Sequence, residues 1–106
     1  MLNQSAIENI VKTIVDGYTP EKIILFGSYA NGNANNESDL DLLIIKKTSE
    51  KQSRRSRQVR YLFSTQEVAM DILVFTPEEI IQLQNNKYNI VSIALNNGIN
   101  LYERAC

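Results

Sequence analysis

The sequence contains no histidine and no tryptophan, and its single cysteine, Cys106, is the last of 106 residues. Without histidine, imidazole general bases, histidine-dependent triads and histidine-based zinc sites are excluded. A single cysteine excludes an internal disulfide or a multi-thiolate metal site and fits a reducing compartment. Any catalysis by this chain therefore has to use carboxylates, hydroxyls and amines.

Long apolar segments and a strong net charge are also missing. No apolar run approaches the ~20 residues that a membrane span needs, and the first residues lack the pattern of a signal peptide. The net charge of −1 does not indicate a nucleic-acid partner for the chain as a whole. With 43% hydrophobic residues, the sequence predicts one domain, residues 1–106, of a soluble cytoplasmic protein.

The sequence does contain alternating helical and strand patterns. Apolar residues at helical spacing predict a first helix that begins at a capping box of Ser5 and Glu8 and ends near Gly17. Short apolar runs predict three strands, at residues 23–26, 40–45 and 70–75. Further helices are expected within residues 50–66, after a Thr76 cap, and over residues 90–97, with a short extended tail at 99–103. This order predicts an α/β (α+β) fold, in which helices pack against a small mixed β-sheet.

Two aspartates one residue apart, Asp39 and Asp41, stand at the start of the second predicted strand. The two-residue period of a strand places both carboxylates on one face, ~7 Å apart along the backbone. Asp71 begins the third predicted strand in the corresponding place. If these strands are neighbours, three carboxylates meet, and a hard divalent cation such as Mg²⁺ is suited to neutralise them. The alternative for an Asp-x-Asp pair is a solvated turn.

A glycine and a serine, Gly27 and Ser28, directly follow the first predicted strand. Glycine lets a phosphate approach the backbone closely, and the serine hydroxyl and the amides that open a helix donate hydrogen bonds to it. The alternative is a plain strand-to-helix turn with Ser28 as the N-cap. The three aspartates elsewhere in the chain favour the phosphate-binding interpretation.

The combined pattern resembles the minimal nucleotidyltransferases of the DNA polymerase beta superfamily. Their Gly-Ser pair, Asp-x-Asp pair and distant third Asp correspond to "FGSYANGNANNESDLDLLI" and "MDILVF" here. The segments "TPEEIIQLQ" and "GINLYERA" also resemble the C-terminal half of these proteins, so the resemblance spans nearly the whole chain. Many relatives carry an arginine where this sequence has Asn31, a difference that bears on how a triphosphate or partner is held.

This resemblance implies the polymerase-beta-like nucleotidyltransferase fold and the transfer of AMP from ATP to an acceptor hydroxyl, with release of pyrophosphate. It implies that Asp39 and Asp41 hold two Mg²⁺ ions. Asp71 would bind the acceptor-side metal and accept the proton of the hydroxyl. Gly27 and Ser28 would hold the β and γ phosphates of ATP.

Small relatives of this kind are familiar as antitoxins of two-gene pairs, whose toxin is a helical HEPN ribonuclease. The resemblance therefore implies an antitoxin that adenylylates a tyrosine hydroxyl of a HEPN toxin encoded by a neighbouring gene. Because 106 residues leave little space for an acceptor domain, the acceptor is expected on another chain, in a hetero-oligomer.

Two alternatives to this function remain. One is a non-catalytic antitoxin that neutralises the toxin by binding, and the other is a nucleotidyltransferase that acts on a small molecule or RNA with an accessory subunit. The three aspartates speak against the first alternative, because a purely binding surface does not require them.

Positive charge is concentrated in residues 46–60, which hold seven of the 11 basic residues and only one acidic residue, Glu50. Two interpretations remain open: a solvated helix start, or a surface that holds phosphate, RNA or an acidic partner. Tyr29 and Tyr61 are candidates for stacking on a base, although ordinary packing is favoured for both.

The last two long predicted helices carry more apolar positions than a small sheet obviously needs. Their burial in the core is expected, and a partner interface is the alternative. These positions are Ile80, Ile81, Leu83, Ile90, Val91, Ile93, Ala94 and Leu95.

Overall fold

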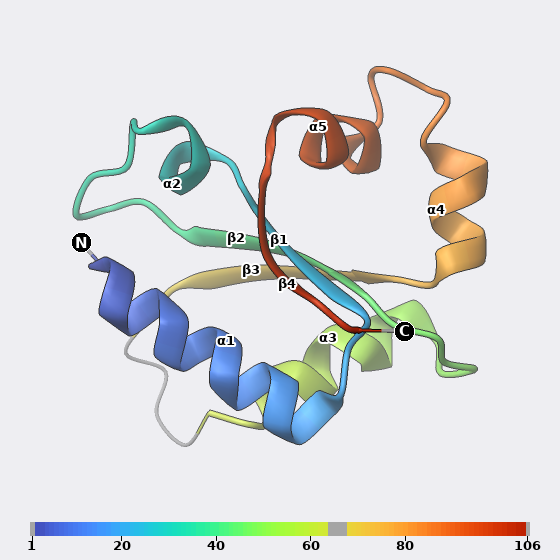
Figure 1. Ribbon diagram of the computed structural model, residues 1–106, viewed down its shortest axis with the longest axis horizontal. Helices are drawn as coiled ribbons and strands as arrows, with labels where there is room; N and C mark the ends of the chain where they lie inside the picture. Colours follow the sequence, from blue (N-terminus) through green and yellow to red (C-terminus); the bar gives the residue numbers. More distant parts are fainter. Residues whose placement is uncertain (1, 64–67, 106) are drawn as a thin grey trace.

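The computed structural model describes residues 2–63 and 68–105, which form a four-stranded sheet with helices on both faces (Figure 1). Strand β1 (Lys22–Phe26) pairs antiparallel with β2 (Leu40–Ile45) and with β4 (Ile99–Glu103). Strand β3 (Met70–Phe75) runs parallel to β2, which gives the order β3-β2-β1-β4. The predicted mixed sheet is confirmed, and the extended tail is its fourth strand.

Five helices surround this sheet in the described part of the chain. Helices α1 (Gln4–Tyr18) and α3 (Gln52–Arg60) cover one face, whereas α4 (Pro77–Leu83) and α5 (Ile90–Asn97) cover the other (Figure 1). The short helix α2 (Ser28–Asn31) follows β1 directly. None of these helices combines the length and the apolar character that a bilayer crossing requires.

The alternation of side chains along β2 divides the core into two clusters. Leu42 and its neighbours two residues away are buried with Ile14 of α1 and Val59 of α3. Leu43 is buried with Ile80 of α4 and Val91 of α5. Because both faces of β2 are covered, its sequence is a nearly continuous apolar run.

The first helix begins and ends differently from the prediction. Its N-cap is Asn3, whose Oδ1 accepts a hydrogen bond from the Ala6 amide at 2.8 Å, so Ser5 does not form the predicted capping box. The helix continues through Gly17 and ends where Thr19 adopts a left-handed conformation. A Cβ at Gly17 would lie 2.6 Å from Leu62 Cδ2, so this glycine permits close packing of Leu62.

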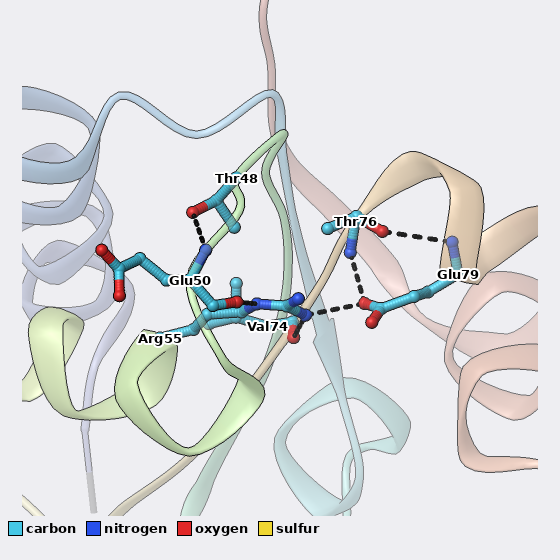
Figure 2. Close-up of polar contacts among 6 residues, drawn as sticks. All are labelled: Thr48, Glu50, Arg55, Val74, Thr76 and Glu79. Carbon is cyan, nitrogen blue, oxygen red and sulfur yellow. Dashed lines mark hydrogen bonds and ion pairs between the residues drawn. The ribbon is translucent and has the colours of Figure 1, made fainter.

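Helix α3 lies within the predicted range 50–66, of which residues 64–66 fall outside the described residues. Of the two interpretations of the basic segment, a solvated helix start does not hold for Arg55, which is buried. Figure 2 shows its guanidinium between α3 and α4, where Nη1 donates to Glu79 Oε1 at 2.7 Å. Arg55 points inward because it lies one turn before the buried Val59.

The predicted cap of α4 is confirmed, because the Thr76 hydroxyl accepts from the Glu79 amide and the Glu79 side chain accepts from the Thr76 amide. The expectation of core burial holds for the buried or half-buried residues Ile80, Leu83, Val91, Ala94 and Leu95. It is wrong for Ile81, Ile90 and Ile93, which are exposed. Helix α5 ends at Gly98, as predicted.

Candidate active site

The candidate site lies at the end of the sheet where β1 stops and β2 and β3 begin. Phe26 pairs with Asp41 across β1 and β2, and Asp41 pairs with Asp71 across β2 and β3. The second and third strands are therefore neighbours, which is the condition under which the sequence placed these carboxylates together. Since paired residues on adjacent strands point to the same face, the Asp41 and Asp71 carboxylates both point to the α4 and α5 side of the sheet.

Gly27, the residue after β1, lies directly against the Asp41 side chain. A Cβ at Gly27 would be 2.1 Å from Asp41 Oδ2, a distance that no other amino acid can accommodate without moving the carboxylate. Gly27 also has φ 75° and ψ −153°, a region that only glycine adopts readily. Both the backbone conformation and the close approach therefore require glycine here.

The electrostatics of the site centre on Asp41, which is half-buried. Burial raises the pKa of the Asp41 carboxyl, and the negative charges of Asp71 and then Asp39 raise it further. All three effects disfavour the charged form of Asp41 in the free protein. A cation bound beside these carboxylates would reverse the effect of the two neighbouring charges.

Asp39 is exposed and lies one residue before β2, rather than within a strand as the sequence suggested. The Leu40 amide donates to the Ala69 carbonyl at 2.9 Å, so the pairing with the β3 side continues up to this point. Within residues 2–63 and 68–105, no three Asp, Glu, His or Cys side chains are close enough to form a preassembled metal centre. Even so, the carboxylate oxygens of Asp39, Asp41 and Asp71 are the type of ligand that a hard cation such as Mg²⁺ prefers, and their mutual repulsion would be relieved by such a cation.

Ser28 is the first residue of α2, and Gly27 is the N-cap of that helix. The Ala30 and Asn31 amides donate to the Gly27 carbonyl at 3.1 and 3.2 Å, which fixes the turn after β1. The first amides of a helix have no acceptor within the helix, so this turn presents donors beside Asp41. Asn31 is exposed, and its Oδ1 accepts from the Asn33 amide at 3.2 Å.

Tyr29 packs against the α1 side of the core, and its hydroxyl accepts from the Leu2 amide at 3.1 Å, so the packing prediction for Tyr29 is confirmed. A cavity of about 590 Å³ lies beside Tyr29, Leu25 and Leu101, on the α1 side. None of the candidate site residues lines it, so this cavity is separate from the aspartates.

The sequence did not predict that the C-terminal strand, β4, pairs with β1 and so supports the strand that leads into the site. Ile99 of β4 pairs with Leu25, two residues before Gly27. A Cβ at Gly98 would lie 2.8 Å from the Leu25 carbonyl oxygen, so Gly98 lets the α5–β4 turn approach β1. The signal in the sequence was the glycine between a helix and an apolar segment, which indicated a helix end but not a partner strand.

A comparison with protein families accounts for this combination of fold and site. The family described as polymerase beta nucleotidyltransferase matches residues 8–105, which is nearly the whole chain. The chain therefore belongs to the polymerase beta nucleotidyltransferase family.

Individual relatives extend this comparison. A proposed protein adenylyltransferase of Methanocaldococcus jannaschii is 45% identical over 47 residues, which are 42% of this chain and 47% of that protein. The match thus covers about half the length of this curated relative.

Two solved structures share the fold. A toxin-antitoxin structure with AMP-PNP is 21% identical, with a TM-score of 0.65, and the match covers 92% of this chain and 73% of that one. The second is a complex of a tri-AMPylated HEPN toxin and its MNT antitoxin from Shewanella oneidensis. It is 20% identical, with a TM-score of 0.59, over 96% of this chain and 74% of that one.

Proposed function

We propose that this chain is an antitoxin-type nucleotidyltransferase that transfers AMP from ATP to a tyrosine hydroxyl of a partner HEPN ribonuclease toxin. The observation that carries this proposal is the row formed by Gly27, Asp41 and Asp71. In this row the backbone of Gly27 lies against the Asp41 side chain, and the like charges of the neighbouring Asp41 and Asp71 carboxylates repel each other. Family membership and the similarity to an MNT antitoxin and to a proposed protein adenylyltransferase also support it.

In the proposed reaction, the acceptor oxygen forms a bond to the α phosphorus of ATP. The bond from that phosphorus to the bridging oxygen breaks, and pyrophosphate leaves. Asp71 accepts the proton of the acceptor hydroxyl, since the chain has no histidine to do so. Gly27 and Ser28 hold the β and γ phosphates through close backbone approach and hydrogen bonds.

Asp39, Asp41 and Asp71 are the residues that would hold two Mg²⁺ ions. When bound, Mg²⁺ neutralises phosphate charge and lowers the pKa of the acceptor hydroxyl. Asp41 is suited to such binding because a cation would offset the repulsion from Asp71 and Asp39 that raises its pKa. The remaining contribution of the chain is the positioning of ATP against the acceptor.

The experiment that tests this proposal incubates the chain with Mg²⁺, the product of the neighbouring gene and ATP labelled at either the α or the γ phosphate. We expect the neighbour to retain the α label and not the γ label, which distinguishes AMP transfer from phosphate transfer. Asp39→Asn/Asp41→Asn is expected to abolish labelling. Glu37→Gln, a change at an exposed carboxylate in the preceding loop, is the matched control and should label normally.

Other outcomes would replace the proposal with one of its alternatives. Full neutralisation of the toxin by Asp39→Asn/Asp41→Asn would show an antitoxin that acts by binding. Label in RNA or in a small acceptor, with none in the neighbour, would show a nucleotidyltransferase with a different acceptor.

A further inference from the structure

The outer face of α3 carries a row of cations that ends in an exposed aromatic ring. Lys51, Arg54 and Arg57 are exposed at intervals of three residues, and Tyr61 follows one turn later with 78% of its surface exposed. The packing expected for Tyr61 from sequence is therefore wrong. At 1.5 Å per residue, successive members of this basic row are separated by ~4.5–6 Å along the helix axis.

The basic row weakens the helix that carries it. Lys51 is the N-cap of α3 but makes no side-chain capping bond, and the first turn contains no acidic residue. Cations at a helix N-terminus oppose the helix dipole, and like charges three residues apart repel. Arg54 has an ion pair with Glu50, at 3.4 Å, but both side chains are largely exposed, so it contributes little. A bound polyanion would offset this unfavourable charge.

Helix α3 is nevertheless firmly attached to the sheet, through its inner face. The buried Arg55 donates from Nε to the Glu50 carbonyl at 2.8 Å and from Nη1 to the Val74 carbonyl at 3.3 Å, in addition to its contact with Glu79 (Figure 2). Val59 is fully buried on the same side. The basic row therefore stands on a support fixed to both β3 and α4.

The position of the row excludes a direct part in the candidate active site. Helix α3 packs on the α1 side of the sheet (Figure 1). Asp41 lies between Leu40 and Leu42 along β2, which face that side, so its side chain points to the opposite, α4 and α5 side. A ligand bound by this row would therefore be different from the nucleotide that the aspartates would bind.

The side chains of α3 favour a nucleic acid over an acidic protein. Protein interfaces need apolar or aromatic anchors at their centre. The only large apolar residue within α3, Val59, faces the core. Among the described residues next to the basic row, Tyr61 is the only exposed aromatic side chain. A row of cations that tracks a nucleic-acid backbone, together with an aromatic ring on which a base stacks, is typical of proteins that bind single-stranded nucleic acids. Gln58, one turn after Arg54, adds an amide suited to a ribose 2′-hydroxyl.

We propose that the basic row of α3 binds single-stranded RNA, with Lys51, Arg54 and Arg57 on successive phosphates and Tyr61 stacked on a base. This binding surface is separate from the candidate active site. The proposal therefore stands or falls independently of the nucleotidyl transfer proposed above.

The test measures fluorescence anisotropy of a labelled 12-nucleotide single-stranded RNA with the full chain, as a function of salt concentration. The variant Lys51→Gln/Arg54→Gln/Arg57→Gln is expected to bind at least tenfold more weakly. Its slope of log affinity against log salt should be shallower by about 2, since each phosphate contact contributes ~0.7. Circular dichroism and thermal unfolding check that the variant is folded.

Tyr61 provides a second, independent readout. Tyr61→Ala is expected to weaken binding by ~5-fold to ~100-fold with an unchanged salt slope, because stacking does not release counterions. Tyr61→Phe should retain binding. The matched control, Lys12→Gln/Lys87→Gln/Arg104→Gln, removes the same charge from exposed positions outside α3 and should weaken binding far less.

Four results would overturn the proposal. The control triple variant could weaken RNA binding as much as the α3 variant, or Tyr61→Ala could leave the affinity unchanged. A polyglutamate peptide that competes as well as RNA of equal charge would indicate an acidic protein partner. A DNA strand of the same sequence that binds equally well would refute the choice of RNA.

Discussion

Replacing Gly27 with alanine tests the geometry of the candidate site most directly. The new Cβ would lie 2.1 Å from Asp41 Oδ2, and the backbone conformation at φ 75° disfavours any residue with a Cβ. Backbone strain costs ~1–3 kcal/mol and overpacking a further ~1–3 kcal/mol. We expect the free energy of unfolding to fall by ~3 kcal/mol, which lowers the melting temperature by more than ~10 °C in a domain of this size.

A matched control separates the contact from the backbone effect. Gly32 also has a positive φ, 82°, but a Cβ there would meet nothing within 4 Å. Gly32→Ala should therefore cost only the ~1 kcal/mol of a left-handed conformation. Thermal or urea unfolding of both variants measures the difference. Since a domain has ~5–15 kcal/mol of stability, both variants should remain folded.

A double-mutant cycle with Asp41→Ala completes this test. Removing the carboxylate removes the atom that the new Cβ would meet, so Gly27→Ala should cost at least ~1 kcal/mol less in that background. If Gly27→Ala costs no more than Gly32→Ala, or if the cycle shows no coupling, Gly27 and Asp41 do not have the close contact argued above. ATP binding by Gly27→Ala should be lost even where the variant is folded, because the new Cβ blocks the close approach of the phosphates and displaces the carboxylate that would hold the cation.

The remaining predictions concern the charged groups. Asp41→Asn should raise the melting temperature of the free protein at neutral pH and abolish activity. Because the pKa of Asp41 is raised in the folded state, the protonated carboxyl is more compatible with folding than the ionised carboxylate is. The stability that Asp41 contributes below its ordinary pKa is therefore lost as the pH rises through the folded-state pKa. The stability gain should therefore vanish in acid, and Asp39→Asn should stabilise less; equal gains at all pH values would refute this. Burial alone would raise the pKa of Glu79, but hydrogen bonds from Arg55 and from the Thr76 amide hold it below its ordinary value. Stability from Glu79 is thus present above its ordinary pKa and is lost as pH falls. Because the Glu79 side chain is 35% exposed, solvent screens its contact with Arg55, so Glu79→Gln should cost ~1 kcal/mol at neutral pH and nothing in strong acid. Glu78→Gln, in the same helical turn, is the control, and an equal cost for both would contradict the Arg55 contact.

Local patterns in the sequence were sufficient to predict most elements of the fold. The apolar runs at 23–26, 40–45 and 70–75 fall within strands, because a strand buried on both faces needs continuous apolar residues. Thr76 and Gly98 marked helix ends, because capping depends on residues only a few positions apart. The first helix was predicted less well, because Asn3 caps it in place of Ser5.

The candidate site was only partly visible in the sequence. The spacing of Asp39 and Asp41 and the glycine after a strand indicated which residues to consider. The sequence did not show that a Cβ at Gly27 would meet Asp41, because that distance depends on the antiparallel pairing of β1 with β2. Nor did it show that Arg55 faces inward while Arg54 and Arg57 face solvent, although the helical spacing of Arg55 and Val59 contained that signal.

The sequence by itself thus determined the elements and the chemical character of the site residues, because periodicity, capping and side-chain chemistry are local properties. The tertiary structure decided the parallel pairing of β2 and β3, which sets Asp41 level with Asp71, and the place of β4 beside β1. It also decided that the basic row of α3 lies on the face of the sheet opposite the aspartates. These features depend on contacts between residues far apart in the chain, and such contacts form only when the sheet and its covering helices assemble.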